Sequence, residues 1–310
     1  MRKILVVGAN PAWQKTLFFP RFQPGEVNRA ERVESYPSGK GVNFCRAARA
    51  YGWAATRLYH FAGGETGRWL DAGLARDGQE AVSFAVAAPT RVCTTLLDGA
   101  RTTELIEPSA TVPPETAAAF LRRLRADLAA DDAAGLAVLG TLPGETDLAL
   151  YRETARAAAG CGRAFLLDAV KGAAAALDAV RDADNVFLKI NREELGKMFG
   201  GADWETALRT AGARWPRAGI AVTAGAGEAA LLWAGAEYRY FPARAEGAVS
   251  SLGCGDTAAA VWLAETLNGV PVPEAFARAL GAASANCLTP LAGEFAPEAA
   301  RALLPAWRKI

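Results

Sequence analysis

Short apolar runs alternate along this chain with longer amphipathic stretches, and this alternation constrains the fold more than any other feature. The runs are continuously apolar, which is typical of strands that are buried on both faces. They lie at residues 4–7, 137–140, 164–167, 186–190 and 220–223. Because strands that are connected through helices pair in parallel, the sequence predicts a mainly parallel sheet with helices on both of its faces.

The stretches between these runs have the spacing of helices that bury one side. Helices are expected at residues 116–128, 146–159, 173–180, 192–199 and 204–211, and then at 256–268, 273–287 and 297–307. Two more strands are expected at residues 230–233 and 238–241. Together these elements predict an α/β fold of three layers, with the sheet in the middle.

Two insertions depart from the alternation and predict a small second sheet. They are residues 12–36 and 91–106, and neither has room for a helix. Their strand-like pieces are residues 16–19, 29–33, 92–97 and 102–106. Such a sheet would form a lid over the ligand edge of the main sheet and exclude water from a reaction there. Since no linker or repeat interrupts the chain, residues 1–310 are expected to form one domain with this lid.

Composition excludes several classes of protein. The chain has 310 residues, is 51% hydrophobic and carries a net charge of +1, so no surface for nucleic acid is expected. The single histidine, His60, and five cysteines without a C-x-x-C pair argue against a zinc site or a histidine-based triad. Cys45, Cys161 and Cys287 are expected to be buried free thiols. Because no apolar segment is long enough to cross a bilayer, we expect a cytoplasmic protein without a membrane partner.

The string Gly253-Cys254-Gly255-Asp256 opens an apolar helical run. Two glycines allow a tight bend that gathers N–H groups at the helix N-terminus, where the helix dipole favours a phosphate or a developing anion. Asp256 lies where a carboxylate could take a proton from an attacking hydroxyl. The alternative is that Asp256 is an ordinary helix N-cap.

A second glycine-rich string, Gly39-Lys40-Gly41-Val42-Asn43, precedes another helical segment. Its glycines let a ligand approach the backbone closely, Lys40 offers a positive charge, and Asn43 offers a donor and an acceptor for neighbouring hydroxyls. The alternative is a glycine turn with a solvated lysine.

In this order the motifs resemble the ribokinase-like (PfkB) carbohydrate kinases over nearly the whole chain. The resemblance is closest to the branch of 1-phosphofructokinases and tagatose-6-phosphate kinases. Further matching strings lie at residues 10–12, 24–29, 90–92, 103–108, 140–143 and 189–194. The resemblance implies an ATP- and Mg²⁺-dependent kinase that phosphorylates a phosphorylated ketohexose, most simply fructose 1-phosphate to fructose 1,6-bisphosphate.

The resemblance also implies catalytic roles. Asp256 would be the general base for the acceptor hydroxyl, and the N–H groups of Gly253, Cys254 and Gly255 would stabilise the transferring phosphoryl group.

On the nucleotide side, Asn191 and Glu194 match the family's N-x-x-E motif, which manages Mg²⁺ through water. The same two residues would serve equally as a helix cap with an acidic first turn. Lys189 would contact nucleotide phosphates, or be a solvated lysine at a strand end. Further nucleotide-side candidates, which a turn and a polar helix face would also explain, are Thr223, Gly225, Gly227 and Asn286.

On the substrate side, Arg91 together with Lys40 would clamp the phosphate that the sugar already carries, unless Arg91 makes a surface ion pair. Gly39 and Asn43 complete the expected substrate site with Gln14. Gln14 stands where the relatives carry an Asp, and it can donate as well as accept, so the identity of the sugar stays open.

Two other functions remain open. One is a kinase of an unphosphorylated sugar or nucleoside, and the other is a sugar-phosphate-binding regulator without catalysis. A homodimer through the lid is also compatible with the apolar residues of the lid.

Overall fold

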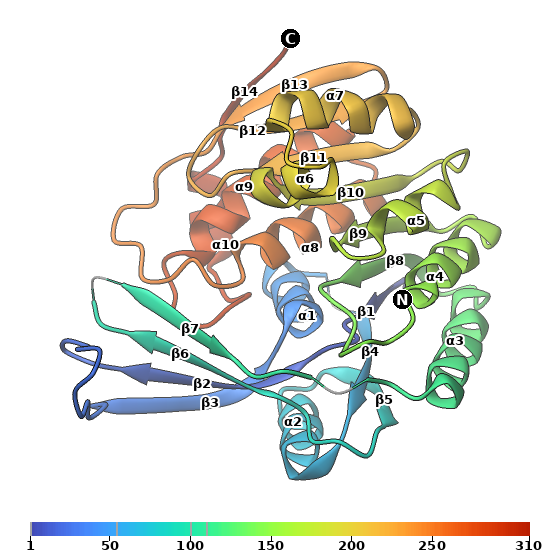
Figure 1. Ribbon diagram of the computed structural model, residues 1–310. Coiled ribbons are helices and arrows are strands. Elements are labelled where there is room, and N and C mark those ends of the chain that lie inside the picture. The colour runs from blue at the N-terminus through green and yellow to red at the C-terminus, as the bar shows by residue number, and fades with distance from the viewer. Residues whose placement is uncertain (1, 54, 100, 110) are drawn as a thin grey trace.

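The computed structural model describes residues 2–53, 55–99, 101–109 and 111–310, and its centre is a ten-stranded sheet (Figure 1). The parallel strands, in spatial order, are β5 (Glu80–Ala85), β4 (Thr56–Ala62), β1 (Lys3–Val7), β8 (Ala133–Leu139), β9 (Ala164–Asp168), β10 (Val186–Asn191) and β11 (Gly219–Thr223). The sheet continues in antiparallel fashion through β12 (Ala229–Trp233), β13 (Ala236–Phe241) and β14 (Ala306–Lys309).

Helices cover both faces of this sheet. Within β1, Ile4 and Val6 belong to one buried cluster and Leu5 and Val7 to the other, as alternation along a strand requires. The first cluster is covered by α1 (Lys40–Tyr51), α2 (Gly64–Arg76), α8 (Cys254–Leu267), α9 (Val272–Asn286) and α10 (Pro297–Ala302). The second is covered by α3 (Pro114–Leu128), α4 (Ala149–Gly160), α5 (Ala173–Asp178), α6 (Arg192–Met198) and α7 (Trp204–Arg214). The predicted three-layer fold class is thereby confirmed.

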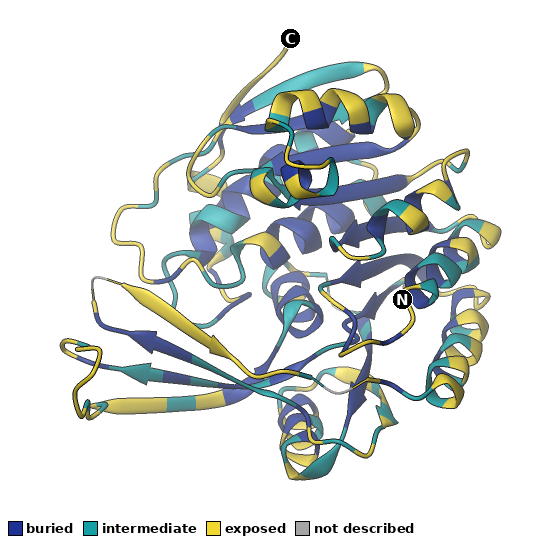
Figure 2. Cartoon of the chain, viewed as in Figure 1, coloured by how far each residue is buried: buried dark blue, intermediate teal, exposed yellow. Residues whose placement is uncertain are grey.

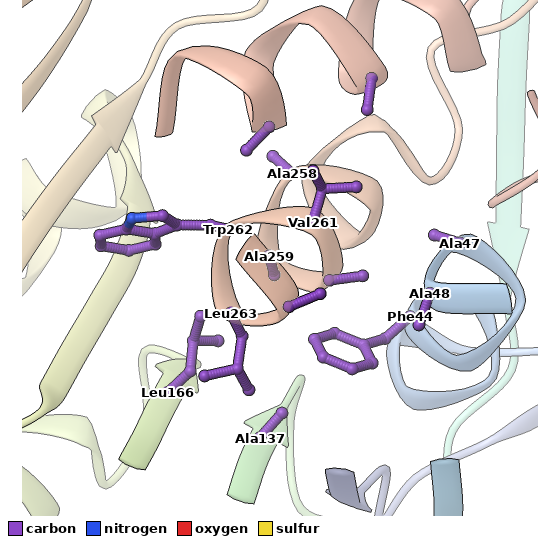
Figure 3. Close-up of a cluster of buried hydrophobic side chains, with 14 of the residues drawn as sticks. Phe44, Ala47, Ala48, Ala137, Leu166, Ala258, Ala259, Val261, Trp262 and Leu263 are labelled. Carbon is purple, nitrogen blue, oxygen red and sulfur yellow. The ribbon is translucent and has the colours of Figure 1, made fainter. Parts of the chain in front are cut away.

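Helix α8 lies inside the molecule, between the sheet, α1 and α9 (Figure 3). Its alanines, such as Ala259, let the neighbouring backbones approach closely, and Phe44 of α1 faces it. Trp262 is fully buried and meets Phe187 of β10 and Phe276 of α9 through ring contacts with centroids 5.2 Å apart. Because α8 is packed on nearly every side, the loop at its N-terminus rests on a rigid support.

Four further strands form a second sheet that extends away from the body of the molecule (Figure 1). They are, in spatial order, β3 (Arg32–Ser38), β2 (Ala12–Phe18), β6 (Val92–Leu97) and β7 (Thr102–Ile106). β7 is exposed along its length, whereas the inner strands β2 and β6 are partly buried (Figure 2).

Most of the expected elements are present, with a few differences. The helix expected at residues 297–307 ends at Ala302, since Pro305 cannot continue it, and β14 follows as an edge strand. The strand piece expected at residues 29–33 begins at Arg32 and runs to Ser38. Elements β4, α2 and β5 were not expected from the apolar pattern.

The cysteines also differ from expectation. Cys45 is buried, but Cys161 is exposed in the turn after α4 and Cys287 is only half-buried at the end of α9. In the described part of the chain, every helix is too short or too polar to cross a membrane.

Candidate active site

The predicted motif residues meet at one edge of the main sheet. Asp168 ends β9, Asn191 ends β10 and Thr223 ends β11, and the carboxyl ends of neighbouring parallel strands share an edge. A cavity of about 770 Å³ lies there, bounded by this edge, by the residue 253–256 loop and by the second sheet. This volume is in the usual range of small-molecule sites.

Every predicted site residue except Gly227 and Asn286 lines this cavity. The lining residues predicted from the sequence are Gln14, Gly39, Lys40, Asn43, Arg91, Lys189, Asn191, Glu194, Thr223, Gly225, Gly253, Cys254, Gly255 and Asp256. A second pocket of about 160 Å³ is also lined by Gly39, Lys40, Arg91 and Glu194, so the two hollows adjoin. The chain therefore brings together two strings that are more than 200 residues apart in sequence.

The residue 253–256 loop is held in a backbone shape that requires glycine. Gly253 has a φ of +79°, and a Cβ on it would come within 2.6 Å of the Cβ of Ala292. Gly253 is the N-cap of α8, so Asp256 lies in the first turn of the helix, and the alternative that Asp256 is the N-cap is wrong. N–H groups of a first turn lack partners within their helix and can serve an anion, although that of Cys254 donates to the Ser251 carbonyl at 3.3 Å in this structure.

Asp256 has the properties of a general base. Its side chain is buried, and Oδ2 accepts a hydrogen bond of 2.8 Å from Asn43 Nδ2. Burial raises the pKa of Asp256 to about 6, and the negative charge of Asp168 adds to this, whereas Lys40, Asn43 and Lys189 oppose it. A carboxylate with this pKa is mostly ionised at neutral pH and still takes up a proton readily.

Asp168 joins the two lysines of the site and was not predicted from the sequence. It is 1% exposed, and its Oδ1 and Oδ2 lie 2.6 Å and 2.7 Å from the Nζ atoms of Lys40 and Lys189. Burial alone would raise the pKa of Asp168, but the two ammonium groups hold this pKa below its usual value. Lys189 is itself 4% exposed, so the alternative of a solvated strand-end lysine is wrong. The signal that could have indicated Asp168 is a carboxylate directly after the expected strand at residues 164–167.

A close contact between the start of α1 and the end of β1 positions Lys40. Gly41 packs against Gly8, which follows β1, and a Cβ on Gly41 would come within 2.5 Å of the Gly8 Cα. The start of α1 is thus seated on the end of the strand. Burial alone would lower the pKa of Lys40, but the carboxylate of Asp168 raises this pKa above its usual value. Lys40 therefore stays positively charged at neutral pH.

Asn191 and Glu194 form a capping box at the start of α6. Asn191 Oδ1 accepts from the Glu194 N–H at 2.8 Å, and Glu194 Oε2 accepts from the Asn191 N–H at 3.2 Å. The capping alternative is therefore confirmed. Because both residues also line the cavity, the cap does not exclude a part in binding.

Asn191 and Glu194 could hold a magnesium ion only if the phosphates of bound substrates supplied further oxygen ligands. Among the described residues, no group of three or more His, Cys, Asp or Glu side chains could hold a metal ion. Mg²⁺ prefers oxygen ligands, retains water and is commonly held by phosphates with one or two carboxylates. Glu194 borders both hollows and supplies such a carboxylate.

Arg91 and Gln14 lie on the side of the cavity that the second sheet forms. The Arg91 guanidinium donates to the main-chain carbonyls of Asn10 at 2.9 Å and Pro11 at 3.4 Å, and it makes no ion pair with a carboxylate among the described residues. Gln14 Nε2 donates to Thr95 Oγ1 at 2.9 Å and to the Lys15 carbonyl at 3.2 Å. Since a carbonyl only accepts, the amide nitrogen faces Lys15, and Gln14 has only its oxygen left for a ligand. Gln14 was expected both to donate to a ligand and to accept from it, but in this structure its side chain can only accept a hydrogen bond from a ligand.

Gly227 and Asn286 are placed away from the cavity. Gly227 donates its N–H to the Ala224 carbonyl in the turn between β11 and β12. Asn286 is fully buried; its Nδ2 donates to the Leu252 carbonyl at 2.8 Å, and its Oδ1 accepts from the Gly293 N–H at 2.7 Å. Asn286 therefore braces the segments beside the residue 253–256 loop from behind.

Comparison with known proteins agrees with this geometry. The sequence pattern of the pfkB family carbohydrate kinases matches residues 1–299. This chain belongs to that family. It is a carbohydrate kinase, and its family implies ATP as the phosphate donor.

Relatives and solved structures match along most of the chain. A 1-phosphofructokinase of Bacillus subtilis (strain 168) is 29% identical over 295 residues, which cover 92% of this chain and 93% of that protein. A D-tagatose-1-phosphate kinase of Klebsiella oxytoca is 28% identical over 46% of each chain. Phosphofructokinase-2 of Escherichia coli in complex with fructose-6-phosphate superposes with a TM-score of 0.82 at 19% identity, covering 98% of each chain. A possible 1-phosphofructokinase of Thermotoga maritima reaches 0.83 at 18% identity over the whole of both chains.

Proposed function

We propose that this carbohydrate kinase transfers the γ-phosphoryl group of ATP to a hydroxyl of a phosphorylated ketohexose, most simply converting fructose 1-phosphate to fructose 1,6-bisphosphate. The observation that carries the proposal is the placement of Lys40 and Arg91 at one cavity with Asp256, in addition to Lys189. ATP needs cations for its own phosphates, and a second phosphorylated ligand explains the extra pair. The name of the Bacillus subtilis relative supports the same substrate class.

In the proposed reaction Asp256 takes the proton of the acceptor hydroxyl as the hydroxyl oxygen attacks the γ-phosphorus. Asn43 holds the carboxylate in place through its 2.8 Å hydrogen bond. The N–H groups of residues 253–255 stabilise the charge on the transferring phosphoryl group from the helix N-terminus. Such positioning and electrostatic stabilisation supply most of the catalysis of phosphoryl transfer.

The nucleotide lies beside Lys189, Thr223 and Gly225 in this proposal. Lys189 meets its phosphates, and Asp168 fixes the position of the lysine. Mg²⁺, bound through phosphate oxygens and water near Asn191 and Glu194, would neutralise phosphate charge.

The second sheet acts as a lid in this proposal, within one domain that spans residues 1–310. Its strands place Gln14 and Thr95, and the residue before β6 places Arg91, against the sugar phosphate, and the sheet excludes water from the transfer. Gln14 accepts a hydrogen bond from a sugar hydroxyl. A neutral acceptor here changes which hydroxyl arrangement is preferred, compared with the Asp of the relatives.

A cytoplasmic location and a homodimer through the lid complete the proposal. Apolar residues exposed on the lid, Val33, Leu105 and Ile106, are 55%, 55% and 62% exposed and would be covered by a second copy. A sedimentation measurement tests the dimer, and a monomer at micromolar concentration would contradict it.

The function is tested by the release of ADP from ATP and Mg²⁺ with fructose 1-phosphate, fructose 6-phosphate, tagatose 6-phosphate and the free sugars in parallel. We expect turnover with one phosphorylated ketose and its loss in Asp256→Asn, whereas Asp182→Asn, at an exposed position away from the cavity, keeps it. Turnover only with a free sugar or nucleoside would contradict the proposed substrate class. Binding of a sugar phosphate without any turnover would favour a regulator.

A further inference from the structure

A cysteine of the residue 253–256 loop, Cys254, meets a second cysteine, Cys287. Cys254 is the first residue of α8, and Cys287 follows the last residue of α9. Both are free thiols, and their Sγ atoms lie 3.1 Å apart. The two residues are 33 positions apart in sequence, so it is the packing of α8 on α9 that brings them together.

The two sulfurs differ in their surroundings. The Cys254 Sγ accepts from Asn286 Nδ2 at 3.3 Å. The contact with the Cys254 sulfur lowers the pKa of Cys287 to about 7, while the same contact together with burial raises the pKa of Cys254. Cys287 is consequently the sulfur that ionises first, and Cys254 is its protonated partner.

One cysteine of the pair borders the active site, and the other, Cys287, is half-buried at the end of α9. Cys254 is half-buried and lines the 770 Å³ cavity, which is wide enough for a small oxidant when no ligand fills it. The other described cysteines differ from this pair. Cys93 also lines the cavity, but burial raises its pKa. Cys45 is fully buried and its pKa is raised by burial to about 12, and Cys161 is exposed on the surface turn after α4.

We propose that Cys254 and Cys287 form an oxidisable dithiol, a modification site for peroxides, and that its disulfide disables the residue 253–256 loop. The Cys287 thiolate attacks one peroxide oxygen, the O–O bond breaks, and the sulfenic acid of Cys287 forms while the departing hydroxide takes up the proton that the Cys287 thiol had released, giving a first water. The Cys254 sulfur then attacks the sulfenic sulfur, and its proton leaves with the hydroxyl group as a second water. In total two thiols lose two electrons and two protons, and one hydrogen peroxide becomes two waters.

Closing the disulfide strains the loop. An S–S bond is about 2.05 Å long, so the sulfurs must move about 1 Å closer than they are in the thiol form. The Cys287 carbonyl also accepts from the Val249 and Ser250 N–H groups, at 2.7 Å and 3.2 Å, so the segment that leads into the loop is tied to the same point. Behind Gly253, Ala292 leaves the loop little room to yield. A displacement of 1 Å at reacting groups costs up to about 100-fold in rate.

The test treats the purified kinase, without ligands, with hydrogen peroxide and measures two quantities. Peptide mapping by mass spectrometry shows whether a Cys254–Cys287 disulfide forms, and the turnover assay gives kcat before oxidation, after it and after addition of dithiothreitol. We expect the mapped disulfide, a loss of kcat of about tenfold or more, and recovery on reduction. The activity readout rests on the proposed function, but the mapping does not, so failure of either can be recognised.

Matched variants separate this pair from general oxidation. Cys287→Ser removes the attacking thiolate. Because position 287 lies outside the residue 253–256 loop, this variant should stay active and should resist peroxide. Cys161→Ser should remain sensitive. The proposal is overturned if no Cys254–Cys287 disulfide is mapped, if the disulfide forms without loss of kcat, or if Cys287→Ser is inactivated as fully as the natural chain.

Discussion

Replacing the proposed base should make this protein more stable. The carboxyl of Asp256 is buried and has a pKa of about 6, against an ordinary value of 3.8. Because the native pKa is the higher one, between these pH values the native state binds a proton that the unfolded state has lost. The free energy of unfolding therefore falls as the pH rises from about 4 to 6, and it stays lowered at higher pH.

The size of the effect follows from the pKa difference. At 1.36 kcal/mol per pKa unit, ionised Asp256 costs the fold about 3 kcal/mol at pH 8 and about half of that at pH 5. Asp256→Asn keeps the shape of the side chain and an oxygen for the hydrogen bond from Asn43, but it carries no charge. The variant should be more stable by these amounts, which for 310 residues is about 5 °C in Tm at pH 8.

The assay is urea unfolding followed by circular dichroism, at pH 8 and at pH 5, for the natural chain, Asp256→Asn and the surface control Asp182→Asn. Turnover of Asp256→Asn should fall by about 10²–10⁴-fold, the usual contribution of a general base. The reasoning would be refuted if Asp256→Asn were no more stable than the natural chain at pH 8. A gain in stability that is equal at both pH values would refute it as well, because it would not come from the charge.

Four other predictions concern the same site. In the natural enzyme kcat/KM should fall below pH 6 as Asp256 is protonated, and a pH profile that stays flat down to pH 5 would contradict this. Arg91→Ala should raise KM for the phosphorylated sugar about tenfold or more, while Arg29→Ala, at an exposed position that does not line the cavity, should leave it unchanged. Asp168→Asn should lower the free energy of unfolding by about 3 kcal/mol in urea, because the buried ammonium group of Lys189 and the half-exposed one of Lys40 lose their common partner; unchanged stability would refute the pairing. Gly253→Ala should lower kcat with little change in KM, because its Cβ would collide with Ala292, and wild-type kcat would show that the loop tolerates the shift.

The fold could be anticipated from the sequence where burial and spacing act together. Strands such as β1, β8 and β10 are buried on both faces and therefore read as continuous apolar runs. β5 was not expected, because it is an edge strand with exposed and half-buried positions and lacks such a run. The end of α10 is set by a single proline, Pro305, and the helical spacing alone did not indicate where the helix ends.

The site could be anticipated where a residue lies in a glycine-rich string, and less well elsewhere. Asp256 and Lys40 stand in strings whose backbone shape indicates a ligand. Asp168 has no such context, and its importance appears only once two lysines from distant segments are placed on its oxygens. Asn286 shows the opposite case, because a polar residue on a late helix is compatible with either a ligand contact or an internal brace, and its neighbours decide. The Cys254–Cys287 contact likewise depends on helix packing that the spacing of the cysteines does not reveal.

In the proposed reaction Asp256 takes the proton from a hydroxyl of the sugar phosphate as the oxygen of that hydroxyl attacks the γ-phosphorus of ATP. The most direct measurement is ³¹P NMR of the products formed from fructose 1-phosphate, ATP and Mg²⁺. We predict that the natural enzyme forms a bisphosphate with its new phosphate on C6, and that Asp256→Asn does not form it over the same time. The absence of any bisphosphate, or its formation at the same rate by Asp256→Asn, would contradict the account.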